Sequence, residues 1–233
     1  MARRFRDGAL PSASSPVQMG GAMFNDRMTR RIFAGGGIAA VGVAVASRGL
    51  AKDLALTAES PMGPFFPLEM PSESDADLTQ LQGHVKRALG TAIEVRGRVL
   101  DRHGNPISGA RLDLWQANAA GRYAHPADVA TAPLDPDFQG FASIVSDSHG
   151  NWRIVTVKPG GYDSPIGHRP PHIHFDIRGK MHRNVAQLYF AEEAEANARD
   201  RLYKALGPDA STSVAKSDSG QPNVYRWDVV LMG

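Results

Sequence analysis

The stretch AIEVRGRVLDRHGNPISGARLDLWQAN, residues 92–118, contains two strand patterns separated by a turn. In the first pattern, apolar or small residues occupy every second position, namely Ile93, Val95, Gly97 and Val99. Such alternation is typical of a β-strand with one buried face. The segment DRHGN, residues 101–105, is rich in turn formers. Leu112, Leu114 and Gln116 then share one side of a second alternating pattern. The stretch therefore predicts two strands joined by a turn.

The same arrangement recurs in FASIVSDSHGNWRIVTVKPG, residues 141–160. Its central segment DSHGN, residues 147–151, differs from DRHGN at a single position, and a strand pattern lies on each side of it. Repeated strand–turn–strand units are typical of a β-sandwich, in which such turns connect successive strands. We interpret His103 and His149 as exposed turn residues rather than metal ligands.

The remaining patterns complete an all-β fold. Three further segments are expected to be strands: PPHIHFDIRG (170–179), NVAQLYFA (184–191) and NVYRWDVVL (223–231). In EEAEANARDRLYKAL (192–206) alanine and leucine recur at helical spacing. The 24 glycines and 16 prolines indicate many loops. The sequence thus predicts a β-sandwich of mostly antiparallel strands with long loops and one late helix.

The composition limits the kinds of site that this chain can build. The sequence has no cysteine, which excludes disulfides, zinc ribbons, thiolate-bound iron–sulfur clusters and cysteine nucleophiles. Any metal must be held by His, Tyr, Asp, Glu or backbone oxygens. Hydrophobic residues make up 42% of the chain, enough for a packed core.

Residues 1–51 have the features of an export leader. They hold seven arginines and two aspartates, so residues 52–233 carry a net charge of −3 and no nucleic-acid surface is expected. Arg30 and Arg31 precede a weakly apolar stretch, residues 34–46, that is too short to span a membrane. This order resembles a twin-arginine signal and predicts a periplasmic or extracellular protein, whose mature form has no membrane span. The alternative is a basic tail that does not direct export.

A candidate metal site lies in HRPPHIHFDIRG, residues 168–179. His172 and His174 are two apart, and residues i and i+2 of a strand point to the same face, so both imidazoles can reach one ion. Pro170 and Pro171 restrict the backbone that leads to them. A His-x-His pair alone also occurs by chance on protein surfaces, and a mononuclear site needs further ligands.

Two tyrosines are candidates for these further ligands. Tyr123 follows AAGR and Tyr162 follows KPGG, so each lies in a loop with glycine just before it, which leaves the backbone free to orient the ring. A phenol ordinarily titrates near pH 10, so a bound phenolate requires a strong Lewis acid. Phenolate oxygen combined with imidazole favours Fe(III) over zinc or magnesium. From the residues alone, an amphipathic residue at the edge of the fold is an equally good interpretation of each tyrosine.

Five motifs, taken together, carry a family resemblance. They are GRVLDRHGNPISGARLDLWQANAAGRYAHP (97–126), LDPDFQG (134–140), KPGGY (158–162), RPPHIHF (169–175) and AQLYF (186–190). In this order and spacing they resemble the intradiol ring-cleaving dioxygenases, and in particular the protocatechuate 3,4-dioxygenase β-type branch. The resemblance covers residues 57–233 and implies that residues 52–233 form one catalytic domain.

The resemblance implies a role for each matching residue. Tyr123, Tyr162, His172 and His174 match the ligands of one non-haem Fe(III) per chain, and Tyr162 matches the tyrosine that leaves the metal when substrate binds. Arg169 matches an active-site arginine, and Gln187 matches a glutamine that lines the pocket. A structural hydrogen bond within a strand remains an alternative for Gln187. His125 and His168 are either close to the ligands or solvated loop residues, and Phe65 and Phe66 belong either to the core or to the pocket wall.

The implied reaction inserts both atoms of O₂ into a catechol. Ring opening between the two hydroxylated carbons gives a muconate-type diacid, with no external reductant. The expected partners are a catechol-type substrate of the protocatechuate kind, O₂, and either further copies of this chain or a second similar chain.

Two other interpretations remain open. A cupin also uses His-x-His, but it places a glutamate four residues after the second histidine, where this chain has Arg178. A non-catalytic, transthyretin-like binding module would explain the segment 97–114, and it would not need the four candidate ligands together.

Overall fold

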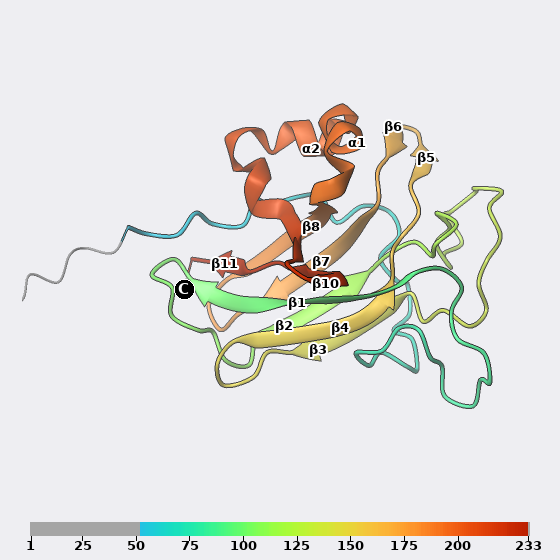
Figure 1. The fold of residues 1–233 in the computed structure, drawn as a ribbon, viewed down its shortest axis with the longest axis horizontal. Coiled ribbons are helices and arrows are strands. Elements are labelled where there is room, and N and C mark those ends of the chain that lie inside the picture. The colour runs from blue at the N-terminus through green and yellow to red at the C-terminus, as the bar shows by residue number, and fades with distance from the viewer. Residues whose placement is uncertain (1–51, 233) are drawn as a thin grey trace, which may run out of the picture. The chain divides into compact units, whose positions relative to one another are not determined.

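The computed structural model of the protein describes residues 52–232, drawn in colour in Figure 1. The predicted export leader, residues 1–51, lies outside the described residues, so the signal and the resulting location stay predictions. In the part of the chain that is described, no helix is both long and apolar enough to cross a membrane.

Eleven strands form within residues 52–232. The first six are β1 (Ala92–Asp101), β2 (Arg111–Trp115), β3 (Phe141–Val145), β4 (Asn151–Val157), β5 (Tyr162–Ser164) and β6 (Gly167–Arg169). The others are β7 (His172–Arg178), β8 (Arg183–Phe190), β9 (Val214–Asp218), β10 (Gln221–Arg226) and β11 (Val229–Leu231). The strands that the sequence patterns predicted form, with one correction: the segment 223–231, expected to be a single strand, is divided between β10 and β11.

Nine of the strands pair into two layers that are joined along one side, and β5 and β6 form a separate two-stranded sheet. In one layer β1 pairs with β4, β10 and β11. In the other layer β2 lies between β3 and β7, and β7 pairs with β8. Strand β9 pairs with both β8 and β10 and so links the layers. Most pairings are antiparallel, and the predicted β-sandwich is confirmed.

The two similar turns connect strands of opposite layers, β1 to β2 and β3 to β4. In the first turn Asp101 Oδ1 accepts hydrogen bonds from the backbone N–H groups of His103 and Asn105, each at 2.8 Å. Asp147 makes the equivalent pair of bonds in the second turn. His103 and His149 are exposed, as expected of turn residues.

Alternation along the strands separates the core from the candidate site. On β1 the residues at 93, 95 and 99 are buried in the core, as the sequence pattern predicted. On β7 the core residues are Ile173, Phe175 and Ile177. Because neighbouring strand residues point to opposite faces, His172 and His174 lie on the outer face of that layer.

An extended arm, residues 52–66, covers part of this outer face. The N–H of Thr57 donates to the carbonyl of Val230 in β11 (3.0 Å), and the N–H of Ser60 donates to the carbonyl of Val185 in β8 (2.7 Å). The arm thus bridges two strands at the open side of the sandwich. Its next residues, Gly63 and Phe65, reach the histidine and tyrosine side chains described below.

The predicted late helix is interrupted. A 3-10 turn (Ala191–Glu193) leads into α1 (Ala194–Arg199) and α2 (Arg201–Ala205), with a further 3-10 segment at Gly207–Ser213. Between the helices, Asp200 has extended backbone angles, φ −65° and ψ 129°. Its carboxylate accepts a hydrogen bond from the N–H of Leu202 (2.7 Å), so Asp200 is the N-cap of α2. Helical spacing predicted a single helix over residues 192–206 and missed the break at Asp200.

Candidate metal centre

The two histidines of β7 face one another. Each is 2% exposed, and their Nε2 atoms are 3.1 Å apart. His174 lies opposite Gln187 of β8 and Trp115 of β2 in the strand register. The indole of Trp115 stacks on the His174 ring, with centroids 5.0 Å apart and planes 11° from parallel. The flanking strand therefore fixes the orientation of this imidazole.

The hydrogen bonding of His172 leaves Nε2 free to act as a ligand. Nδ1 is 2.6 Å from the carbonyl oxygen of Pro170. A carbonyl only accepts, so Nδ1 carries the proton and Nε2 keeps its lone pair. Burial, followed by the nearby charge of Arg169, lowers the pKa of His172 to about 3. The ring is therefore neutral near pH 7, as metal binding requires.

The two candidate tyrosines complete the group. Tyr162 begins β5, and its Oη is 3.5 Å from Nε2 of His172. Tyr123 comes from the loop after β2, with its ring centroid 5.4 Å from that of Tyr162 and 6.3 Å from that of His174. Oη of Tyr123 is buried without a hydrogen-bond partner. The structure thus brings all four predicted ligands together.

Glycine contacts explain how the two tyrosine loops meet. Gly121 has a φ of +78°, and a Cβ there would lie 2.3 Å from the carbonyl oxygen of Gly161. The N–H of Gly160 donates to the carbonyl of Asn118 at 2.9 Å, which joins the loops directly. These glycines were expected to leave the tyrosine rings free to turn. Their role here is instead to let two backbones pack closely, which brings the rings together.

The buried phenols need a cation to ionise. Burial raises the pKa of Tyr123 well above its ordinary value and also raises that of Tyr162. A metal ion would reverse this preference by stabilising the phenolates. Two neutral imidazoles and two phenols form a nitrogen and hard-oxygen donor set that suits ferric iron. This donor chemistry is what makes the four residues fit the implied ion. In residues 52–232, no group of three or more His, Asp or Glu side chains could hold a metal.

Arg169 lies buried beside this group. It ends β6 and is the cross-strand partner of Tyr162. Its Nε donates to Oδ2 of Asp200 at 2.9 Å. Its Nη2 donates to Oε1 of Gln187 at 2.6 Å and to Oη of Tyr189 at 3.2 Å. The guanidinium is thus held inside the protein by three side chains.

Gln187 holds Arg169 from β8. It is 0% exposed, and its Nε2 donates to the carbonyl oxygen of Pro61 in the arm at 3.1 Å. Both ends of its amide are therefore occupied, and Gln187 joins the arm, Arg169 and β8. A direct part in catalysis remains a prediction for this residue.

Sequence reasoning missed Asp200 and Tyr189, the other partners of Arg169. Asp200 lay within a helical pattern and resembled an ordinary polar helix residue. Tyr189 is two residues after Gln187 and so shares its face of β8, a signal that identifies the position but not the contact. A single side chain accounts for both the break in the helix and the ion pair. The carboxylate of Asp200 caps α2 and also accepts a hydrogen bond from the Arg169 guanidinium.

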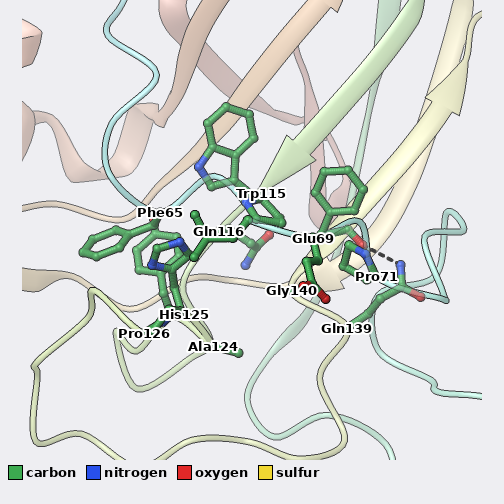
Figure 2. Close-up of a pocket in the computed structure, with 14 residues that line it drawn as sticks. Phe65, Glu69, Pro71, Trp115, Gln116, Ala124, His125, Pro126, Gln139 and Gly140 are labelled. Carbon is green, nitrogen blue, oxygen red and sulfur yellow. Dashed lines mark hydrogen bonds between the residues drawn. The ribbon is translucent and has the colours of Figure 1, made fainter.

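The structure distinguishes the four residues whose roles the sequence left open, namely His125, His168, Phe65 and Phe66. His168 is exposed in β6 and pairs with its cross-strand neighbour Asp163 at 2.8 Å, so it is a solvated residue of the β5–β6 hairpin. His125 lines a pocket beside Tyr123, shown in Figure 2. Phe65 stacks on the Tyr123 ring with centroids 4.4 Å apart, and Phe66 packs edge-on against Trp115. Phe65 thus forms a wall of the candidate site, whereas Phe66 packs with Trp115 and Phe141.

Comparison with known proteins gives a consistent match. A family model described as dioxygenase matches residues 62–233. The protocatechuate 3,4-dioxygenase β chain of Burkholderia cepacia is 38% identical over 175 residues, covering 68% of this chain and 72% of that protein. The α chain from the same organism is 33% identical over 189 residues, covering 76% of this chain and 92% of that protein.

Solved structures agree on the fold. The dioxygenase domain of a dioxygenase and carbohydrate-binding protein fusion from Streptomyces sp. SirexAA-E has a TM-score of 0.57 and 25% identity. The alignment covers 76% of this chain and 98% of that one. An intradiol ring-cleavage dioxygenase from Tetranychus urticae has a TM-score of 0.60 and 20% identity, and covers 76% of this chain and 94% of that one.

Proposed function

This chain belongs to the intradiol ring-cleaving dioxygenase family, and we propose that Tyr123, Tyr162, His172 and His174 hold its ferric ion. The family is known to use non-haem Fe(III). The observation that carries the proposal is the convergence of two phenols and two neutral imidazoles, with the Nε2 lone pair of His172 facing both Tyr162 and His174. We further propose one ion per chain.

A bound ferric ion would favour loss of phenolic protons and draw electron density from a chelated catechol. The protein residues supply the remaining functions. Tyr123 is 3% exposed, and its backbone N–H donates to Oδ2 of Asp128 at 2.7 Å, so it is held firmly. Tyr162 is half-buried on the short β5–β6 hairpin, which Figure 1 shows projecting beyond the main layers. Tyr162 is therefore the better placed to move and to accept a proton from a substrate hydroxyl.

Arg169 supplies a fixed positive charge near the reacting group. Its partners Asp200, Gln187 and Tyr189 leave the guanidinium little freedom to reorient. A charge fixed before the reaction begins stabilises developing negative charge without the cost of reorganisation. We propose that Arg169 acts in this way on the oxygen and ring atoms of the substrate.

The family indicates a catechol as the class of substrate. Which catechol this chain cleaves is a proposal. The relatives are named as acting on protocatechuate, catechol and hydroxyquinol. We propose a protocatechuate-like catechol, because the relative that is 38% identical is a protocatechuate 3,4-dioxygenase chain. Both the α and the β chain of that enzyme match, which supports assembly with further copies of this chain or with a second similar chain.

Oxygen uptake with a panel of catechols tests this proposal. Iron-loaded protein is expected to consume O₂ with protocatechuate faster than with catechol, hydroxyquinol or substituted catechols. The product should be a muconate-type diacid, identified by mass and by absorption. A semialdehyde product would mean that cleavage occurs outside the two hydroxylated carbons, which is incompatible with the proposed centre.

The alternatives find no support in the site. A cupin needs a fourth ligand at the position of Arg178, and this side chain pairs instead with Asp176 and is 45% exposed. A non-catalytic module does not require four potential metal ligands around one buried point. The family match covers residues 62–233 and includes all four.

Gly63 of the arm should matter for activity more than for stability. Its φ is +77°, and a Cβ there would lie 3.3 Å from Cε1 of His174. We expect Gly63→Ala to cost about 1 kcal/mol of folding free energy through backbone strain. By displacing His174 it should also lower kcat/KM about tenfold or more. Thermal unfolding and oxygen uptake measure the two effects.

Gly83 provides the matched control for this substitution. Its φ is +80°, but a Cβ there would have nothing within 4 Å. Gly83→Ala should therefore carry a similar strain cost and leave kcat/KM unchanged. Equal activity in the two variants would contradict a role for Gly63 in positioning His174.

A further inference from the structure

Tyr189 lies between a proposed metal ligand and the buried arginine. It is 0% exposed and stands directly opposite His172 in the register of β7 and β8. The two rings have centroids 6.0 Å apart and planes 29° from parallel. Directly opposed residues of neighbouring strands point to the same face and interact. The phenol ring therefore lies beside the imidazole whose Nε2 is proposed to bind the metal.

The second histidine has an equivalent aromatic neighbour on the other side of β7. Trp115 of β2 lies opposite His174 in the strand register and stacks on its ring. Each proposed imidazole ligand is thus flanked by one aromatic residue of an adjacent strand. Neighbouring aromatic rings favour particular relative orientations. The two aromatic residues are therefore placed to orient the two imidazoles.

The hydroxyl of Tyr189 joins the hydrogen bonds that hold Arg169. Its Oη accepts from Nη2 of Arg169 at 3.2 Å and donates to Oε1 of Gln187 at 3.0 Å. The same Nη2 donates to that Oε1 at 2.6 Å. A guanidinium only donates, so the phenol keeps its own proton for an acceptor, and Gln187 is nearer than Oδ2 of Asp200 at 3.5 Å. The three side chains thus form a closed, buried ring of hydrogen bonds.

Packing of the main core does not explain a tyrosine at this position. Leu188 and Phe190, its neighbours in β8, belong to the main core, so Tyr189 points to the opposite face. A phenylalanine would fill nearly the same volume without burying a polar group that needs partners. The hydroxyl is therefore the feature to be explained, and its shortest contacts are with Gln187 and Arg169.

We propose that Tyr189 is a positioning residue of the reaction: its ring holds the proposed ligand His172, and its hydroxyl holds the guanidinium of Arg169. The inference rests on the proposed function, because it needs both the ferric centre and the part assigned to Arg169. One side chain then sets the separation between a metal ligand and the cation that stabilises developing charge. A displacement of about 1 Å in such an arrangement costs about a hundredfold in rate.

Tyr189→Phe separates the two contacts, because it keeps the ring beside His172 and removes the hydroxyl. After loading with Fe(III) this variant should hold as much iron as the parent and show the same tyrosinate absorption band. Its kcat should fall about tenfold, through loss of one hydrogen bond to a charged group. KM should stay within about twofold of the parent value, because Arg169 acts on charge that develops after substrate has bound. Oxygen uptake over a range of substrate concentrations measures both constants.

Tyr189→Leu removes the ring as well as the hydroxyl. Besides the loss in kcat, this variant should release iron to a competing chelator about tenfold faster than the parent, since residues that support a metal-bound histidine contribute about 10–100-fold. Tyr189→Phe should release iron at the parent rate, which assigns the effect on iron to the ring. The chelator measurement requires no turnover.

Tyr225→Phe is the matched control. The Tyr225 hydroxyl donates to Glu192, and its ring packs edge-on against Phe190, so this variant also loses a tyrosine hydrogen bond but leaves the Arg169 network intact. Its kcat, absorption band and rate of iron release should be those of the parent, even if its stability falls.

The inference is overturned if Tyr189→Phe turns over like the parent, or if Tyr189→Leu holds iron as firmly as the parent. It is also overturned if Tyr225→Phe lowers kcat as much as Tyr189→Phe does. In these cases the parent binds iron and cleaves catechols, so the role of Tyr189 fails alone. A parent protein that takes up no ferric ion would refute the proposed function and this inference together.

Discussion

A Tyr123→Phe variant should lose its iron and its ring-cleavage activity. The substitution removes one oxygen atom from a ring that is otherwise packed on Phe65, so the fold should be kept. That oxygen is buried and makes no hydrogen bond within the protein, as expected of an atom placed to bind a metal. Mutations of residues that only support the metal ligands already lower metal affinity or activity about 10–100-fold. We expect kcat/KM to fall by about a thousandfold or more, measured by oxygen uptake, with iron per chain measured by metal analysis.

Tyr203→Phe is the matched control for Tyr123→Phe. Tyr203 is half-buried in α2, and its ring packs against Tyr189 rather than against the proposed ligands. Iron content and turnover should remain those of the parent protein. Near-normal turnover in Tyr123→Phe, with iron retained, would refute the assignment of Tyr123 as a ligand. His174→Ala removes one of the proposed imidazole ligands and should likewise lose iron and ring-cleavage activity.

An Asp200→Asn variant should be both unstable and slow. The Arg169–Asp200 pair is buried on both sides, with side-chain exposures of 5% and 0%. Removing one charge from a buried pair leaves the other unpaired and typically costs about 3–5 kcal/mol. Asparagine still caps a helix, so the cap on α2 should survive and the charge effect is isolated. Denaturant unfolding measures the stability, and oxygen uptake measures the loss of kcat that a displaced Arg169 would cause.

Glu195→Gln is the control for this charge removal. Glu195 pairs with Arg199 at 2.8 Å in α1, but the side chains are 90% and 76% exposed, and such pairs contribute little. No measurable change in stability or turnover is expected. If Asp200→Asn likewise changed neither stability nor turnover, the buried pair would have no part in holding Arg169.

The strands and the histidine pair could be predicted because short-range patterns determine them. Alternation gave β1, the i, i+2 spacing placed His172 and His174 on one face, and the DxHGN segments gave the two turns. In each case the controlling contacts are within a few residues of one another. Such patterns are visible in a single sequence.

The rest of the site depends on contacts between distant segments. The loops that hold Tyr123 and Tyr162 meet through the glycine contact of Gly121 with Gly161, which no local pattern encodes. The break at Asp200 contradicts a good helical pattern, because the Asp200 carboxylate makes two contacts at once: Oδ1 caps α2, and Oδ2 accepts from Arg169, a residue distant in sequence. The arm reaches β8 and β11 across more than a hundred residues of sequence. The resemblance named the candidate ligands, and the structure added what surrounds them.

Metal analysis combined with visible absorption tests the central assignment most directly. After loading with Fe(III), the protein should retain about one ferric ion per chain and show the reddish charge-transfer band of iron-bound tyrosinate. Tyr123→Phe and Tyr162→Phe should each weaken or shift that band, because each removes one proposed phenolate. Protein that remains colourless and free of iron after ferric loading would contradict the four-residue centre and the reaction proposed for it.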